Sequence, residues 1–73
     1  MSGLLPSLTS KEIIKILQRI GFEFYRQSGS HRIYVKGESQ VIVPFHNKDI
    51  KKGTLYQIIK GTGLSIDEFK KFL

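Results

Sequence analysis

The hydrophobic positions of the chain recur first with the spacing of a helix. Between Ile13 and Ile20, isoleucine and leucine return every three or four residues, with polar and basic residues between them. Thr9 and Glu12 stand three residues apart just before this run, which is the spacing of a capping box. Gly21 follows the run and suits the left-handed backbone that ends many helices. The pattern therefore predicts a first helix between Thr9 and Gly21.

The middle of the chain alternates hydrophobic and polar positions, which is typical of β-strands. Short clusters rich in Gly and Ser interrupt the alternation and predict turns. We expect three strands over residues 22–27, 31–36 and 40–44, with turns over residues 27–30 and 37–39. Consecutive strands joined by short turns form an antiparallel meander.

The expected register decides which side chains share a face of this sheet. A turn over residues 27–30 makes Arg26 and His31 the last directly opposed pair, with their Cβ atoms about 5 Å apart. Alternation then places this pair with Phe24 and Ile33, at the rim of the face that the helices cover. The side chains expected on the opposite, uncovered face include those of Tyr25, Arg32 and Tyr34.

Helical spacing returns after a polar connection over residues 45–49. We expect a second helix from about Lys51 to Thr62, and Ser65 with Glu68 forms a capping box that opens a short final helix. The residues of this end expected to point inward are Phe69, Phe72 and Leu73. The order α-β-β-β-α plus a short C-terminal helix predicts an α+β fold, with helices on one face of a three-stranded antiparallel sheet. No repeat or linker divides the sequence, so we expect residues 1–73 to form one domain.

Charge and composition narrow the classes of function. Twelve Lys and Arg residues against six Asp and Glu residues give a net charge of +6 at pH 7. This charge favours association with polyanions such as nucleic acid or an acidic protein, and no apolar run is long enough to span a bilayer. The absence of cysteine excludes disulfides and thiolate metal sites, and it fits a reducing cytoplasm.

One short segment combines groups suited to nucleic-acid chemistry. His31 follows a Gly-containing turn and lies in the sequence between Arg26 and Arg32. Imidazole can take and return a proton near neutral pH, and guanidinium donors match the oxygens of a phosphate. A proton carrier beside a phosphate-binding group is suited to the cleavage of RNA. The alternative is a strand-edge histidine bonded to a carbonyl, between two solvated arginines.

A second basic segment precedes the second helix. Lys48, Lys51 and Lys52 could hold a backbone phosphate at the helix N-terminus, although a solvated run of charge is the alternative. In the same connection, His46 could be a second proton carrier, a loop residue or a partner contact, and the sequence favours a structural role. His31, His46 and Asp49 lack the spacing of a metal site. We therefore expect no metal and no other cofactor.

A series of short motifs runs through nearly the whole chain. They are Leu5-Pro6, Gly21-Phe22, Arg26 with Gly29-Ser30-His31, Val43-Pro44 followed by His46, Gly53-Thr54-Leu55 with Ile58 and Ile59, and Gly63-Leu64-Ser65. With these motifs, the chain resembles the HicA (YcfA-like) family of bacterial and archaeal toxins, which are small messenger-RNA interferases. The resemblance implies a fold like the double-stranded RNA-binding domain, metal-independent RNA cleavage and neutralisation by a HicB-type antitoxin. It also implies that His31 is the catalytic histidine.

The leading hypothesis is therefore a toxin that cleaves messenger RNA in the cytoplasm, without membrane association and with a HicB-type antitoxin as its protein partner. In this hypothesis His31 is catalytic. The residues expected to bind RNA are Arg26, Ser30, Arg32, Lys48, Lys51 and Lys52. A second hypothesis is a non-catalytic module that binds double-stranded RNA with the same positive surface. A third is a chain that acts mainly as half of a protein interaction pair.

Overall fold

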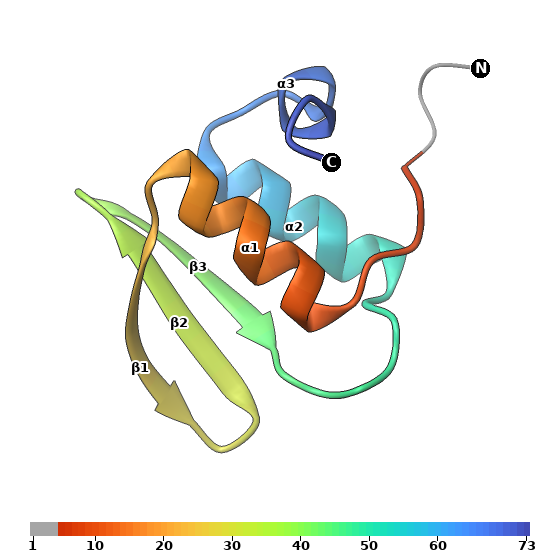
Figure 1. Ribbon diagram of the computed structural model, residues 1–73. Helices are drawn as coiled ribbons and strands as arrows, with labels where there is room; N and C mark the ends of the chain where they lie inside the picture. Colours follow the sequence, from red (N-terminus) through yellow and green to blue (C-terminus); the bar gives the residue numbers. More distant parts are fainter. Residues whose placement is uncertain (1–4) are drawn as a thin grey trace.

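A computed structural model describes residues 5–73, and over this range the order of helices and strands agrees with the sequence prediction (Figure 1). The elements are α1 (Ser10–Ile20), β1 (Glu23–Ser28), β2 (His31–Lys36), β3 (Ser39–Pro44), α2 (Lys52–Thr62) and α3 (Ile66–Lys70). The α+β class and the arrangement of helices around one open three-stranded sheet are therefore confirmed. Within residues 5–73, no helix combines the length and apolar character that crossing a membrane requires.

Local sequence signals fix the ends of α1 as predicted. The Thr9 hydroxyl accepts the Glu12 amide at 3.3 Å, and the Glu12 carboxylate accepts the Thr9 amide at 2.9 Å. These two bonds satisfy amides that have no partner inside the helix. At the other end, Gly21 has a φ of 115°, and its amide donates to the carbonyls of Leu17 and Gln18. A left-handed residue at this position costs least as glycine.

The strands form one antiparallel sheet in the order β1-β2-β3, with β2 in the centre (Figure 1). Both turns are shorter than predicted, because each hairpin closes with a two-residue loop. The register pairs Ser28 with His31 in the first hairpin and Lys36 with Ser39 in the second. Gly29 has a φ of 58° at the first position of its loop, where a tight hairpin turn favours glycine. The expected direct pair of Arg26 with His31 is therefore wrong.

The shorter second turn also corrects the predicted faces of the sheet. Val41 and Val43 of β3 are buried in the core beneath the helices. Because directly opposed residues share a face, their partners Tyr34 and Arg32 lie on the helix side as well. Tyr34 was expected on the uncovered face, yet it is only 2% exposed and belongs to the core. Ile33, expected under the helices, lies on the opposite face, where it is only 7% exposed although it is outside the main core cluster.

A bulge in β1 separates two residues that were expected to share a face. The register shifts between Phe24 and Arg26. Phe24 pairs with Tyr34 on the helix side, where the two rings meet edge to face with centroids 5.7 Å apart. Arg26 pairs with Ile33 on the uncovered face. Side chains of a strand alternate between the two faces, and the extra residue of the bulge, Tyr25, interrupts this alternation.

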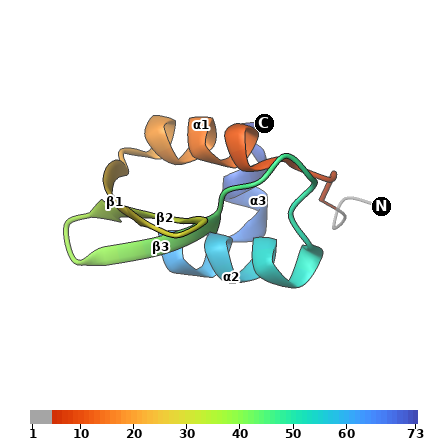
Figure 2. The same ribbon diagram turned by 90° about the horizontal axis from the view of Figure 1, so that it is seen from below.

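The core lies between the sheet and the helices, and α2 runs alongside β3 (Figures 1 and 2). Its largest fully buried side chains come from β2, β3 and every helix: Tyr34, Phe69, Ile13, Leu17, Leu55, Val43 and Ser10.

The capping box of α3 forms as predicted, and the Ser65 amide and hydroxyl hold the pKa of the Glu68 carboxyl below its usual value. Phe69 is fully buried as expected, whereas Leu73, also expected to point inward, is 51% exposed.

Gly61 allows α2 to approach β3 closely. A Cβ atom at Gly61 would lie 2.7 Å from Cγ1 of Val41 and 3.3 Å from the carbonyl oxygen of Gln40. Gly53, in the first turn of the same helix, would meet no described atom within 4 Å. We expect Gly61→Ala to lower the free energy of unfolding by about 1–3 kcal/mol, because the added methyl group overpacks the contact.

The matched variant Gly53→Ala should instead raise the free energy of unfolding by about 0.5–1 kcal/mol, because alanine favours the helix and meets no neighbour. Urea unfolding of the two variants beside the unchanged protein measures both effects. Two changes of the same sign would contradict the tight contact between α2 and β3.

Candidate functional site

His31 is the first residue of β2, and its side chain is exposed on the uncovered face of the sheet. Ser28 of β1 and Pro44 of β3 lie directly across from it. Arg26 lies on the same face, across from Ile33, and is therefore a diagonal neighbour of His31. Diagonal neighbours on adjacent strands are about 7–8 Å apart, a distance that the long arginine side chain can span. The structure thus brings Arg26 and His31 together, although not as a direct pair.

The His31 ring forms no hydrogen bond with any residue in the range 5–73. The structure therefore does not contain the alternative arrangement, in which the His31 ring bonds a neighbouring carbonyl oxygen. An exposed imidazole without a protein partner can accept a proton from a bound molecule or donate one to it.

The turn that precedes His31 is held by the side chain of Gln27. Its Nε2 donates to the carbonyl oxygen of Gly29 at 2.9 Å, and its Oε1 accepts from Nε of Arg32 at 3.1 Å. These two bonds connect the tip of the hairpin to the strand that carries the histidine. The role of Gln27 could not be read from the sequence, because it depends on the register that places Gln27 across from Arg32.

Arg32 lies on the helix side of the sheet and not beside His31. Its guanidinium carbon is 3.8 Å from the centroid of the Phe45 ring and 5.8 Å from that of Phe24. A guanidinium over an aromatic ring is attracted to the electrons of its face. Neighbouring residues of a strand project to opposite faces, so Arg32 and His31 lie on different faces of the sheet. On its own face Arg32 packs against two rings and donates a hydrogen bond to Gln27.

A hollow of about 270 Å³ lies where β3 leads into α2. Its lining residues are Pro44, His46, Lys48, Asp49, Ile50, Lys51 and Thr54. One of these residues, Pro44, lies directly across from His31. Lys51 is the N-cap of α2, no side chain caps this helix, and its first turn contains no acidic residue. Helix amides and lysines together make this end of the hollow favourable for an anion.

The three lysines predicted to bind RNA have different environments in the structure. Lys48 and Lys51 are exposed and line the hollow. The ammonium group of Lys52 donates instead to the carbonyl oxygen of Leu5. Lys52 therefore ties the segment before α1 to the start of α2. Ser30 is exposed at the tip of the first hairpin, and its carbonyl oxygen accepts the Phe45 amide at 2.6 Å.

Ser10 is a residue of this region that the sequence analysis missed. Its side chain is fully buried, and its hydroxyl donates to the carbonyl oxygen of Pro44 at 2.5 Å. The Ser10 hydroxyl oxygen also accepts the His46 amide at 3.2 Å, and it lies 3.2 Å from the His46 carbonyl oxygen. Ser10 thus joins the start of α1 to the loop after β3. The contact spans more than thirty residues of sequence, so no local pattern indicates it.

We expect Ser10→Ala to lower the free energy of unfolding by about 1–3 kcal/mol, because it leaves buried backbone groups without a partner. Denaturant unfolding measures this loss. Ser7→Ala, at an exposed position of the same segment, is the control and should change stability little. A Ser10→Ala protein as stable as this control would contradict the anchoring role of the hydroxyl.

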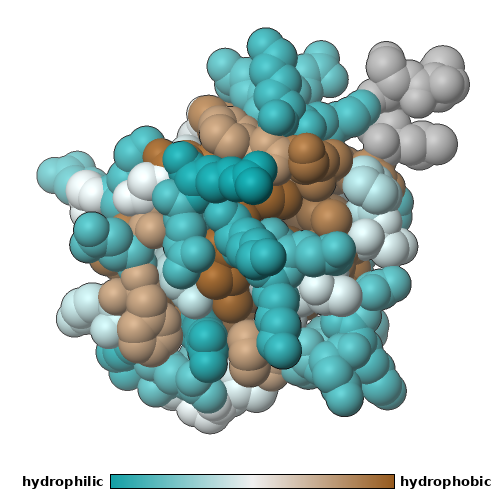
Figure 3. Space-filling model, in the orientation of Figure 1, coloured by the Kyte–Doolittle hydropathy of each residue, from teal (hydrophilic) through white to brown (hydrophobic). Residues whose placement is uncertain are grey.

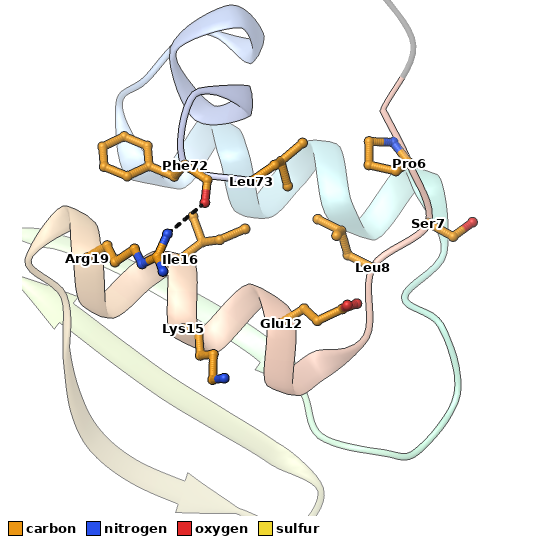
Figure 4. Close-up of a pocket in the computed structure, with 9 residues that line it drawn as sticks. All are labelled: Pro6, Ser7, Leu8, Glu12, Lys15, Ile16, Arg19, Phe72 and Leu73. Carbon is orange, nitrogen blue, oxygen red and sulfur yellow. Dashed lines mark hydrogen bonds between the residues drawn. The ribbon is translucent and has the colours of Figure 1, made fainter.

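A second hollow, of about 380 Å³, lies across α1 from the sheet and is mostly apolar (Figures 3 and 4). Its lining residues are Pro6, Ser7, Leu8, Glu12, Lys15, Ile16, Arg19, Phe72 and Leu73. Arg19 donates from Nη1 to the carbonyl oxygen of Phe72 at 3.4 Å, which holds the C-terminal residues against α1 (Figure 4). This hollow contains no histidine and none of the predicted site residues, so it is not the candidate site.

Most of the chain matches a known protein family. A family model described as "HicA toxin of bacterial toxin-antitoxin" matches residues 10–64. The matched segment begins at α1, includes the whole sheet with His31 and ends just after α2. A comparison with curated proteins gave no match.

Proposed function

Because the chain belongs to the HicA family of toxins from bacterial toxin–antitoxin systems, we propose that it is a metal-independent endoribonuclease that cleaves messenger RNA with His31. The observation that carries this proposal is the exposed His31 ring on an open sheet face that it shares with Arg26. A reactive group must be reachable by a polymer as large as RNA, and this face of β2 meets that requirement.

In the proposed mechanism, neutral His31 withdraws the proton of a ribose 2′-hydroxyl. The 2′-oxygen forms a bond to phosphorus, the bond from phosphorus to the 5′-oxygen breaks, and the proton passes from His31 to that 5′-oxygen. Activation of a water molecule by the same imidazole is the alternative route. In this proposal Arg26, on the same face as His31, neutralises the charge that develops on the phosphate oxygens.

The RNA backbone is proposed to run from the tip of the first hairpin to the start of α2. Ser30 marks one end of this path, and Lys48 and Lys51 at the hollow beyond Pro44 mark the other. Lys52 would add to the positive potential of this end. We assign Arg32 a supporting role for the hairpin in place of the direct phosphate contact predicted from the sequence, since it lies on the opposite face and packs on Phe45.

A HicB-type antitoxin is the proposed protein partner, and the cytoplasm, where messenger RNA is translated, is the proposed site of action. The family membership supports an antitoxin in general. The net charge of +6 favours a partner that presents acidic groups.

Incubation of the purified protein with end-labelled RNA in excess chelator tests the proposed activity. Shortened products under these conditions support a metal-independent nuclease. An RNA band that is shifted on a native gel but intact on a denaturing gel would overturn the proposal in favour of the non-catalytic RNA-binding module. Low sequence preference is expected, because A-form RNA is recognised mainly through its shape and backbone.

A further inference from the structure

The loop after β3 holds a second histidine, His46, in a defined position. Its amide donates to the buried Ser10 hydroxyl at 3.2 Å, and its carbonyl oxygen lies 3.2 Å from the same hydroxyl. The preceding residue, Phe45, donates its amide to the carbonyl oxygen of Ser30 at 2.6 Å. The backbone at His46 is therefore anchored to α1, and that of the preceding Phe45 to the turn before His31.

The ring of His46 is oriented by a bond of its own. Its Nδ1 accepts the backbone amide of Lys48 at 3.2 Å. A neutral imidazole that accepts at Nδ1 carries its proton on Nε2. While Nδ1 accepts this bond, His46 presents an Nε2–H donor at an exposed position.

The two histidines are close along the fold. Pro44 lies directly across from His31, and His46 follows Pro44 by two residues. Adjacent antiparallel strands separate paired Cα atoms by about 4.5–5.5 Å, and each further residue adds at most about 3.8 Å, so the two histidine Cα atoms are within about 13 Å. Pro44, which pairs with His31, and His46 also line the same hollow at this end of the sheet.

We propose that His46 is a second catalytic residue, which donates a hydrogen bond from Nε2 to a non-bridging oxygen of the phosphate attacked at His31, with Ser10 as its positioning residue. This inference rests on the proposed function. Negative charge grows on the non-bridging oxygens as the 2′-oxygen adds to phosphorus, and a fixed neutral donor stabilises that charge without losing its own proton. His31 moves the proton, and His46 holds the phosphate.

Two substitutions at His46 separate this role from a purely structural one. His46→Asn retains an oxygen that can accept the Lys48 amide, as asparagine does in many turns, but it removes the donor at the Nε2 position. His46→Gln places an amide N–H near the position of Nε2. We expect His46→Asn to lower the rate of RNA cleavage by about 10²–10³-fold and His46→Gln to retain much of the wild-type rate, with both variants unfolding at the wild-type temperature.

The second measurement uses an RNA in which sulfur replaces one non-bridging oxygen of a single cleavable phosphate. Sulfur accepts hydrogen bonds weakly, so one of the two stereoisomers should be cleaved more slowly by the wild-type protein. In His46→Asn this difference should disappear, because the donor is already absent. A rate for His46→Asn equal to the wild-type rate, a His46→Gln protein as slow as His46→Asn, or an undiminished sulfur effect in His46→Asn would each overturn the role of His46. A wild-type protein that leaves the all-oxygen RNA intact would instead refute the nuclease function itself.

Discussion

Replacement of His31 with alanine is expected to abolish growth arrest on induced expression and to lower the rate of RNA cleavage by about 10²–10⁴-fold. The physical reason is the loss of the group that removes and returns the proton during cleavage. The His31 side chain is exposed and has no hydrogen-bond partner within residues 5–73. Its removal should therefore leave the thermal unfolding temperature almost unchanged.

Ser28→Ala is the matched control, because Ser28 lies directly across from His31 on the same face and is also exposed. This variant should arrest growth as the wild-type protein does. Growth arrest by His31→Ala at an equal level of soluble protein would contradict the assignment of His31. Loss of growth arrest in both variants would indicate that truncation of any side chain on this face inactivates the protein. That result would also contradict a specific catalytic role of His31.

Replacement of Phe69 with alanine is expected to cause the largest loss of stability, about 3–5 kcal/mol. Phe69 is the fully buried residue through which α3 joins the core, and its removal leaves a cavity that a small domain can close only in part. A natural domain is stabilised by only about 5–15 kcal/mol in total. A substantial fraction of the Phe69→Ala protein should therefore be unfolded at moderate temperature.

Leu73→Ala is the control for Phe69→Ala, since Leu73 belongs to the same C-terminal segment but is 51% exposed. Circular dichroism during heating measures both variants. A Phe69→Ala protein that unfolds together with Leu73→Ala would show that α3 is dispensable for the core. The comparison matters because α3 lies outside the segment that matches the family, residues 10–64.

Local chemistry explains why the order and most ends of the elements could be predicted from the sequence. A capping box or a C-terminal glycine determines a helix end through bonds between residues three or four apart. The bonds of Thr9 with Glu12, and of Ser65 with Glu68, depend on nothing beyond the neighbouring turn. These capping signals determine the helix ends independently of the tertiary structure.

The faces of the sheet were predicted wrongly because they depend on single-residue counts. A three-residue second turn would have paired Val41 with Val35, whereas the observed two-residue loop pairs Val41 with Tyr34. One residue of difference moves every side chain of a strand to the other face. Tyr34 and Arg32 exchange faces with Ile33 for this reason, and the bulge at Tyr25 repeats the effect in β1.

The candidate site shows the same division between local and long-range information. The sequence drew attention to His31 and Arg26, which do lie on one face. It could not reveal the contact of Ser10 with the loop after β3, because the partners are more than thirty residues apart. The position of Arg32 over the Phe45 ring likewise depends on the register of β2 with β3.

The most direct test of the account compares the rates at which the wild-type protein and His31→Ala, purified in parallel, cleave one labelled RNA in excess chelator. We predict rapid cleavage by the wild-type protein and a rate at least about 10²-fold lower for His31→Ala. Equal rates for the two proteins would contradict it, since the cleavage would then arise from another residue or from a contaminating nuclease.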